Sequence, residues 1–179
     1  MRYLALALVF AGCAGQDVAQ MNEGDPVGGG GVGGGPSDEF NTPTVCSSNV
    51  HWTRGDRGSA QMHPGGECVS CHDADNGPSL AFGGTVYPTA HEPDDCNGIA
   101  GNAQVTVTDS NGYMMTATVN SAGNFYMRTT SMFVPPFTAM VVANGKQRQM
   151  TTPQDNGDCN SCHTETGTNQ APGRIILPN

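Results

Sequence analysis

Apolar and polar residues alternate along much of the chain after residue 80. Residues 103–129 contain three such runs, and Asn111-Gly112 separates the first two. A period of two predicts strands that bury one face. An Asn-Gly pair predicts a hairpin, because both residues tolerate the positive φ of a tight turn. A second hairpin is expected around Asn144-Gly145.

The expected strands are short and closely spaced, and amphipathic helical periodicity is scarce. They cover residues 81–87, the three runs within 103–129, 137–143, 147–151 and 174–177. Short strands joined by tight turns predict a mainly-β fold. We expect a small Greek-key β-sandwich with little helix and with irregular segments at both ends.

The N-terminal residues are not expected to join this fold. Residues 1–12 contain one arginine and an apolar run too short to span a bilayer, which predicts a secretory signal peptide. The sequence FAGC resembles a bacterial lipobox, with phenylalanine in place of the usual leucine. This resemblance implies lipidation of Cys13 and, with Ala14 next, anchoring of an exported protein to the outer membrane. The alternative is an ordinary signal peptide whose cysteine is incidental.

The rest of the chain divides into a tether and one modest domain. Residues 13–44 are rich in glycine and lack apolar periodicity, which predicts a flexible tether. Residues 45–179 are expected to form the folded domain. The net charge of -9, from 16 acids against 7 bases, argues against nucleic-acid binding, which requires a basic surface. It favours steering toward a basic partner.

The order of the expected strands resembles the carboxypeptidase-regulatory-like, prealbumin-type sandwich. In that family a G-x-V-Y strand precedes an A-x-V-x-V-x-D strand, a turn and a G-N-F-Y-like strand. The matching segments are residues 84–87, 103–109 and 123–126. The resemblance implies a fold and little about function, because such sandwiches mostly serve as scaffolds.

Two segments share the spacing C-x-x-C-H. Residues 67–73 read ECVSCHD, and residues 157–167 read GDCNSCHTETG. The residues concerned are Cys68, Cys71 and His72 in the first motif and Cys159, Cys162 and His163 in the second. This spacing attaches c-type haem: two thiols add to the two vinyl groups of one porphyrin, and the histidine then lies beneath the iron. We expect two covalently attached haems, one in each irregular segment.

Other interpretations of these cysteines remain open. Paired C-x-x-C motifs also form zinc ribbons, although zinc would not explain a histidine at the same offset twice. A single C-x-x-C can be a thioredoxin-like redox pair, but no βαβ pattern surrounds either copy. In an oxidising compartment each pair could instead form a local disulfide.

The remaining cysteines support the haem prediction. Once four of the seven are assigned to haem and Cys13 to lipid, Cys46 and Cys96 are left. An even remainder in an exported protein predicts one disulfide.

Each iron then has a sixth position that a histidine or methionine of the chain could fill. We expect His91 and His63 to serve as distal ligands, with His51 as the third choice. Methionine is the competing ligand, and its candidates are Met62, Met114, Met115 and Met150. Ligation by histidine on both sides would give lower reduction potentials than histidine with methionine.

The whole pattern resembles small dihaem lipoproteins of bacteria, in which two C-x-x-C-H motifs bracket a β-sandwich. The residues that carry the likeness are MHPGGECVSCH, FGGTVYPTAHEPDDCNG, SAGNFY, GDCNSCH and APGRIILP. It implies electron transfer. We expect a non-catalytic, membrane-anchored electron carrier, because two six-coordinate irons would leave no site open for a substrate. Its expected partners are other cytochromes, and assembly with further copies of itself is left open.

Two alternatives come from other classes of protein. One is a haem enzyme that reduces peroxide or a nitrogen oxide at an open iron, with Arg54 and Arg57 beside His51 as its weak support. The other is a structural or adhesive lipoprotein with zinc or disulfide sites.

Overall fold

The computed structural model describes residues 39–179. The predicted signal peptide, the predicted lipidation site Cys13 and the tether as far as residue 38 lie outside the described residues. Within the described part of the chain, no helix is both long enough and apolar enough to cross a membrane.

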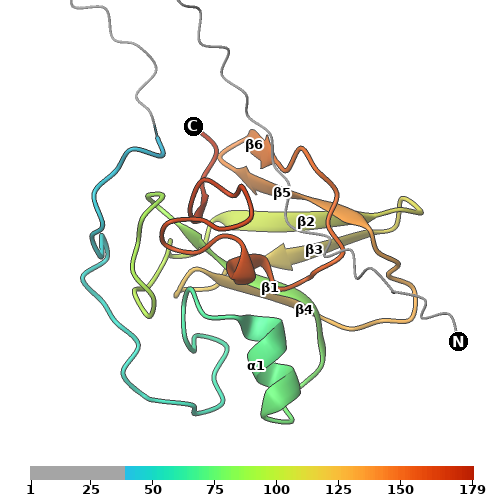
Figure 1. Ribbon diagram of the computed structural model, residues 1–179, viewed down its shortest axis with the longest axis horizontal. Coiled ribbons are helices and arrows are strands. Elements are labelled where there is room, and N and C mark those ends of the chain that lie inside the picture. Colours follow the sequence, from blue (N-terminus) through green and yellow to red (C-terminus); the bar gives the residue numbers. More distant parts are fainter. Residues whose placement is uncertain (1–38) are drawn as a thin grey trace, which may run out of the picture.

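The strands of the described residues form two sheets that pack against each other (Figure 1). The first sheet has the order β4-β1-β7 and consists of β4 (Asn124–Arg128), β1 (Leu80–Tyr87) and β7 (Ile175–Ile176). The second has the order β3-β2-β5-β6 and consists of β3 (Met114–Thr118), β2 (Ala103–Asp109), β5 (Phe137–Ala143) and β6 (Lys146–Gln149). The pairing of β1 with β7 is parallel and the other pairings are antiparallel.

The alternation of apolar and polar residues that predicted the strands matches the alternation of buried and exposed positions along them. Along β2 the buried positions are every second residue, and Val105 and Val107 are both within the core. Phe82 and Val86 of β1 and Phe125 of β4 face them from the other sheet. The core therefore lies between the two sheets, where apolar side chains leave water.

The structure confirms the mainly-β sandwich and most of its predicted strands. Asn144 and Gly145 have φ 51° and +74° between β5 and β6, as a two-residue hairpin turn requires. Between β2 and β3 the turn is different, because Gly112 has φ +80° but Asn111 does not have a positive φ. β6 covers 146–149 rather than 147–151, because the two-residue turn lets Lys146 pair directly with Ala143. The last strand is limited to Ile175–Ile176.

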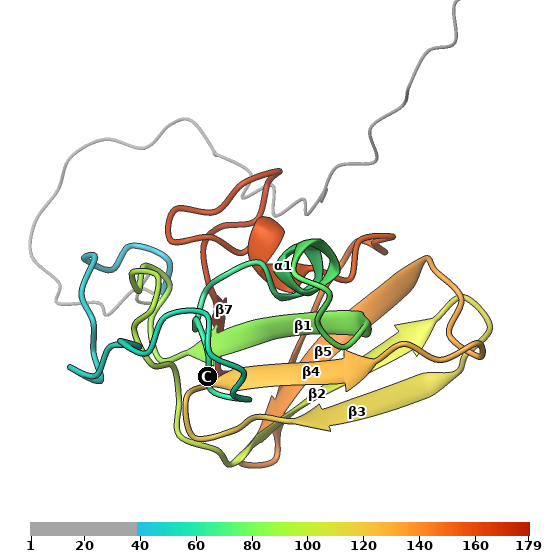
Figure 2. The same ribbon diagram turned by 90° about the horizontal axis from the view of Figure 1, so that it is seen from below.

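Two short helical segments interrupt this β fold. The helix α1 (Cys68–Ala74) contains the first C-x-x-C-H motif, and the 3-10 turn η1 (Cys159–Ser161) begins the second. Figure 2 shows α1 and η1 side by side on the same side of β1. β6 does not neighbour β1, since the two strands belong to different sheets. The second motif reaches β1 because the backbone N–H of Gly83 donates to the carbonyl of Gly157 at 3.0 Å.

Residues just before the predicted domain boundary also contact the sandwich. Glu39 forms an ion pair with Arg148 of β6, with 2.6 Å between Oε1 and Nη1. Thr44 donates its hydroxyl hydrogen bond to Glu165 at 3.0 Å. The predicted disulfide between Cys46 and Cys96 is present, with 5.6 Å between the two Cα atoms. It links this N-terminal segment to the loop after β1.

Candidate cofactor site

The first motif presents two thiols and an imidazole along α1. Cys68 is half-buried against β1, whereas Cys71 is exposed. Nδ1 of His72 lies 3.0 Å from the carbonyl oxygen of Pro78. A carbonyl can only accept, so Nδ1 carries the proton and Nε2 has the free lone pair.

The second motif repeats this arrangement on a different local structure. Nδ1 of His163 lies 2.9 Å from the carbonyl oxygen of Gly173, which fixes the same tautomer. Desolvation of the His163 ring lowers its pKa, so the imidazole stays neutral to lower pH than usual. Histidines that bind metals through one nitrogen usually donate the other N–H to an acceptor of this kind. Both motif histidines are therefore prepared to bind a metal through Nε2.

The two motifs meet at a pair of glycines in β1. A Cβ placed on Gly83 would lie 3.0 Å from Cβ of Cys68. A Cβ placed on Gly84 would lie 2.9 Å from Cβ of Cys159 and equally close to the ring of Phe125. A side chain at either glycine would push a motif away from the sheet. The missing side chains thus create the space in which one cysteine of each motif packs.

Each motif borders its own cavity. Cys68, Cys71 and His72 line a cavity of about 500 Å³, which His63 also lines. The residues of the second motif, Cys159, Cys162 and His163, line another of about 380 Å³. Both volumes lie within the range of small-molecule and cofactor sites.

A single aromatic ring belongs to the walls of both cavities. Phe125 of β4 lines the first cavity and the second. Its side chain is almost completely buried, with 1% of its surface exposed. Groups bound in the two cavities would therefore both lie next to the Phe125 ring.

Hydrogen bonds connect the two motifs directly. The carboxylate of Asp158, which precedes the second motif, accepts from the backbone N–H of Ser70 at 2.9 Å and from its hydroxyl at 2.7 Å. The side-chain amide of Asn160, inside the second motif, donates to the carbonyl of Gly66 at 2.8 Å. Its oxygen accepts from the backbone N–H of Thr85 at 3.1 Å. The two motifs therefore form one packed unit on β1.

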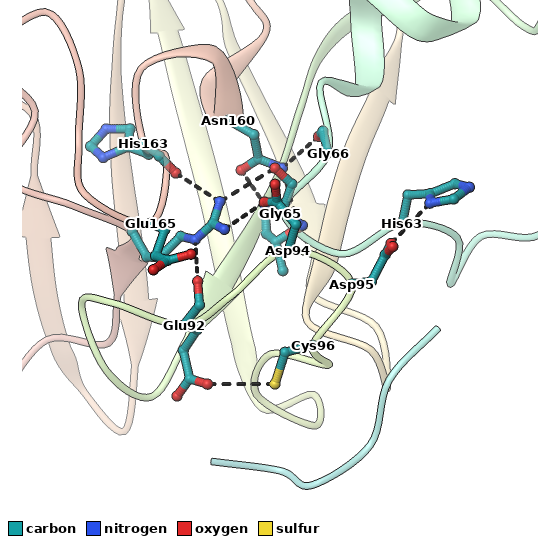
Figure 3. A network of polar contacts seen from close by, with 12 residues as sticks. His63, Gly65, Gly66, Glu92, Asp94, Asp95, Cys96, Asn160, His163 and Glu165 are labelled. Carbon is teal, nitrogen blue, oxygen red and sulfur yellow. Dashed lines mark hydrogen bonds and ion pairs between the residues drawn. The ribbon is translucent and has the colours of Figure 1, made fainter. Parts of the chain in front are cut away.

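Arg174 joins the surrounding loops to this unit. Its guanidinium donates to the carbonyl oxygens of Glu92, Gly65 and His163 at 2.8, 3.3 and 3.4 Å. It also forms a 2.6 Å ion pair with Asp94. Figure 3 shows these acceptors, from both motif segments and from the loop after β1, gathered in one network.

This role of Arg174 was not predicted from the sequence. The side chain is 2% exposed and its guanidinium lies 5.1 Å from the centre of the Tyr87 ring. In the sequence it is a lone cation at the start of a predicted strand, where arginines are usually exposed. No local pattern distinguishes a buried arginine from an exposed one.

The predicted distal ligands lie in different surroundings. His63 lines the cavity of the first motif; its Nδ1 lies 2.9 Å from Asp95 and its Nε2 lies 3.1 Å from the exposed carboxylate of Asp56. Of the methionine candidates, Met62 lines the first cavity and Met150 the second. Met140, which the sequence did not single out, also lines the second.

His91 and His51 border neither cavity. The ring nitrogens of His91 lie 2.5 Å from the carbonyl oxygen of Glu165 and 2.6 Å from that of Phe40. These two hydrogen bonds raise the pKa of His91, because both can form only when both nitrogens carry protons. His51 is exposed and pairs with the backbone of Cys96. The structure thus brings one of the three histidines to a motif.

The motif thiols are poor nucleophiles in this arrangement. Burial raises the pKa of both Cys68 and Cys159 to about 12, and burial followed by the nearby Asp75 raises the pKa of Cys71. Thioredoxin-like cysteines require the opposite shift. Cys68, Cys71 and Cys159 are free thiols, whereas Cys162 is disulfide-bonded. Any thioether at Cys162 requires reduction of that bond first.

A third group of ligand atoms lies away from both motifs. Cys46, Glu92 and Cys96 have their ligand atoms within 4.8 Å of one another, but the two cysteines form the disulfide. Glu92 is fully buried, and its carboxylate accepts from the N–H of Ser47 at 2.9 Å and from the hydroxyl of Thr89 at 2.9 Å. These bonds satisfy the carboxylate and hold the N-terminal segment on the domain.

Comparison with known proteins gives no relative: no family model, curated protein or solved structure matches this chain.

Proposed function

We propose that the protein is a dihaem c-type cytochrome that carries electrons. The observation that supports this most is the shared state of the two motif histidines. His72 and His163 each donate Nδ1–H to a backbone carbonyl, present a free Nε2, and line the same cavity as the cysteines of their motif. Disulfide chemistry does not require this tautomer, and zinc, which could use it, would not explain a histidine directly after both pairs of cysteines.

The donor set of the first motif fits haem as it stands, and that of the second motif fits once the disulfide of Cys162 is reduced. Cys68 and Cys71 would hold one porphyrin with His72 as the iron ligand, and Cys159, Cys162 and His163 would hold the other. The glycine pair of β1 leaves room for the motifs to pack without a bulky side chain beneath them. Bound haem supplies reversible one-electron chemistry at iron. The sandwich supplies the fixed spacing between the two motifs.

His63 would be the second histidine to hold the iron at the first motif, because it lines the same cavity as His72. Asp95 binds its Nδ1 at 2.9 Å and sets the tautomer, while Asp56, whose side chain is 85% exposed, can release Nε2 to water. If His72 and His63 both held the iron, no position would remain for a substrate, which suits electron transfer rather than substrate chemistry. The acidic surface, export and lipid anchoring predicted from the sequence complete this proposal, with a redox protein as partner.

The second cavity favours a second candidate function. Among its lining residues His163 is the single histidine, and Met140 and Met150 are the other soft ligands. An iron held there would be ligated by methionine or remain open. An open iron would allow reduction of peroxide or a nitrogen oxide, so this site is where the enzymatic alternative applies.

A zinc-binding function is less well supported. Within residues 39–179 the one group of clustered ligand atoms is Cys46, Glu92 and Cys96, which includes no motif residue.

Expression together with a c-type haem maturation system tests the proposal. We expect the intact mass to exceed that of the polypeptide by two haems, and the reduced spectrum to show low-spin bands. The double variant Cys68→Ser/Cys71→Ser should carry one haem, and His51→Ala, which alters an exposed histidine outside both cavities, should carry two. A colourless protein at the polypeptide mass would contradict the proposal, and a high-spin component that responds to cyanide would favour the enzyme.

A further inference from the structure

Asp158 is a buried carboxylate between the two motifs. Asp158 is 2% exposed and lines the second cavity. Oδ2 accepts both hydrogen bonds from Ser70 of the first motif. Oδ1 is buried without any hydrogen-bond partner. Half of a carboxylate left unpaired in the interior is costly, which points to a role that depends on its charge.

No cation neutralises this carboxylate within the described residues. The ion pairs of that part of the chain join His63 to Asp56 and Asp95, Arg148 to Glu39, and Arg174 to Asp94. Arg148 and Arg174 also line the second cavity, but each is paired with another acid. The negative charge of Asp158 therefore acts on its surroundings at low effective dielectric.

Asp158 contacts both motifs. Its hydrogen bonds reach Ser70, which lies between Cys68 and Cys71 in the sequence. Asp158 directly precedes Cys159 and lines the second cavity together with Cys159 and His163. Its carboxylate therefore lies beside both sites.

We infer that Asp158 is a shared tuning and positioning residue for the two haem sites. Its negative charge favours the ferric over the ferrous state at both irons, because the oxidised site carries one more positive charge. Its hydrogen bonds to Ser70 hold α1 against η1 and so fix the distance between the sites. This inference rests on the proposed function, since it requires haem at both motifs.

The charge and the hydrogen bonds can be separated by substitution. Asp158→Asn keeps an oxygen that accepts from Ser70 but removes the charge. Each haem gains one electron on reduction, and a shift of the reduction equilibrium toward the ferrous state by roughly tenfold would raise its midpoint potential by about 59 mV. We expect a rise of this order at both haems in a spectroelectrochemical titration at neutral pH.

Two matched variants serve as controls. Asp155→Asn removes the same charge from an exposed position three residues earlier, and screening by water should leave both potentials close to those of the parent. Ser70→Ala removes the hydrogen bond from the Ser70 hydroxyl but retains the Asp158 carboxylate and the hydrogen bond from the backbone N–H of residue 70. It should therefore lower the free energy of unfolding while leaving both midpoint potentials nearly unchanged.

The outcomes separate this inference from the proposed function. A parent protein without haem overturns the proposed function. A parent with two haems and an Asp158→Asn variant with unchanged potentials overturns the inference alone. If Asp158→Asn does not fold, Asp158→Ser makes the same comparison with a smaller polar side chain, and unchanged potentials would again overturn it.

Discussion

Gly84 of β1 lies directly beneath Cys159, so that a Cβ on Gly84 would approach Cβ of Cys159 to 2.9 Å. The neighbouring Gly83 has the same relationship with Cys68 at 3.0 Å. Successive residues of a strand point to opposite faces. The space that a side chain would fill at Gly83 is taken by Cys68, and the space at Gly84 is taken by Cys159. The two motifs, 91 residues apart at Cys68 and Cys159, are thus placed by two adjacent glycines.

We predict that Gly84→Ala destabilises the protein by about 1–3 kcal/mol, because the new methyl group overlaps Cys159 and the Phe125 ring. Urea unfolding followed by circular dichroism measures this. Gly58→Ala is the matched control, since nothing lies within 4 Å of a Cβ at that position. Equal stability of the two variants would show that Cys159 does not pack on Gly84.

Removing the guanidinium of Arg174 should be costly. Arg174→Met leaves the carbonyl oxygens of Glu92, Gly65 and His163 without this donor. Each buried acceptor left unpaired costs about 1–3 kcal/mol, and partial relaxation makes a total loss of roughly 3–5 kcal/mol reasonable. Arg54→Met, at an exposed arginine near Trp52, should change the free energy of unfolding very little. A small effect of Arg174→Met in the same urea titration would contradict the network.

The charge of His91 should make stability depend on pH. Its hydrogen bonds to the carbonyls of Glu165 and Phe40 raise the folded pKa above the value of 6.5. The stabilisation is therefore fully present below pH 6.5 and is lost as the pH rises through the folded pKa. In His91→Gln this pH-dependent stabilisation should be absent. The free energy of unfolding of the parent should therefore exceed that of the variant most at low pH, and the difference should narrow as the pH rises. A difference that stays constant across the titration would argue against a charged His91.

His63 should affect one haem and leave the other unchanged. His63→Ala removes the imidazole from the wall of the first cavity, where His72 also lies. We expect about half of the low-spin signal to become high-spin, and the midpoint potential of that haem to change, because one axial ligand is lost. His91→Ala is the informative comparison, since His91 borders neither cavity. Loss of low-spin signal in His91→Ala instead would assign the ligand to His91.

Met150→Ala tests the second cavity in the same way. Met150 and Met140 line it together with His163. If Met150 ligates the iron, the variant should lower the midpoint potential of that haem, because methionine ligation raises it. Met114→Ala, at a residue 62% exposed on β3, is the control and should leave both potentials unchanged. Identical spectra and potentials for Met150→Ala and the parent would exclude Met150 as a ligand.

The sequence by itself determined the features that depend on short spacing. The alternation within residues 103–109 and the Asn-Gly pairs specify strands and turns, because side-chain period and backbone φ are local properties. The C-x-x-C-H spacing specifies the two motifs for the same reason. The disulfide between Cys46 and Cys96 followed from counting cysteines and is present in the structure.

Only the tertiary structure decided which of these residues meet. His63 borders the first cavity and His91 does not, although both stood in loops near a predicted site. Asp158 meets Ser70 across 88 residues of chain, and Arg174 is buried among carbonyls from three separate segments. Such contacts depend on how two sheets and two short helices pack. Packing is set by the shape and burial of the whole domain, which no local pattern of residues encodes.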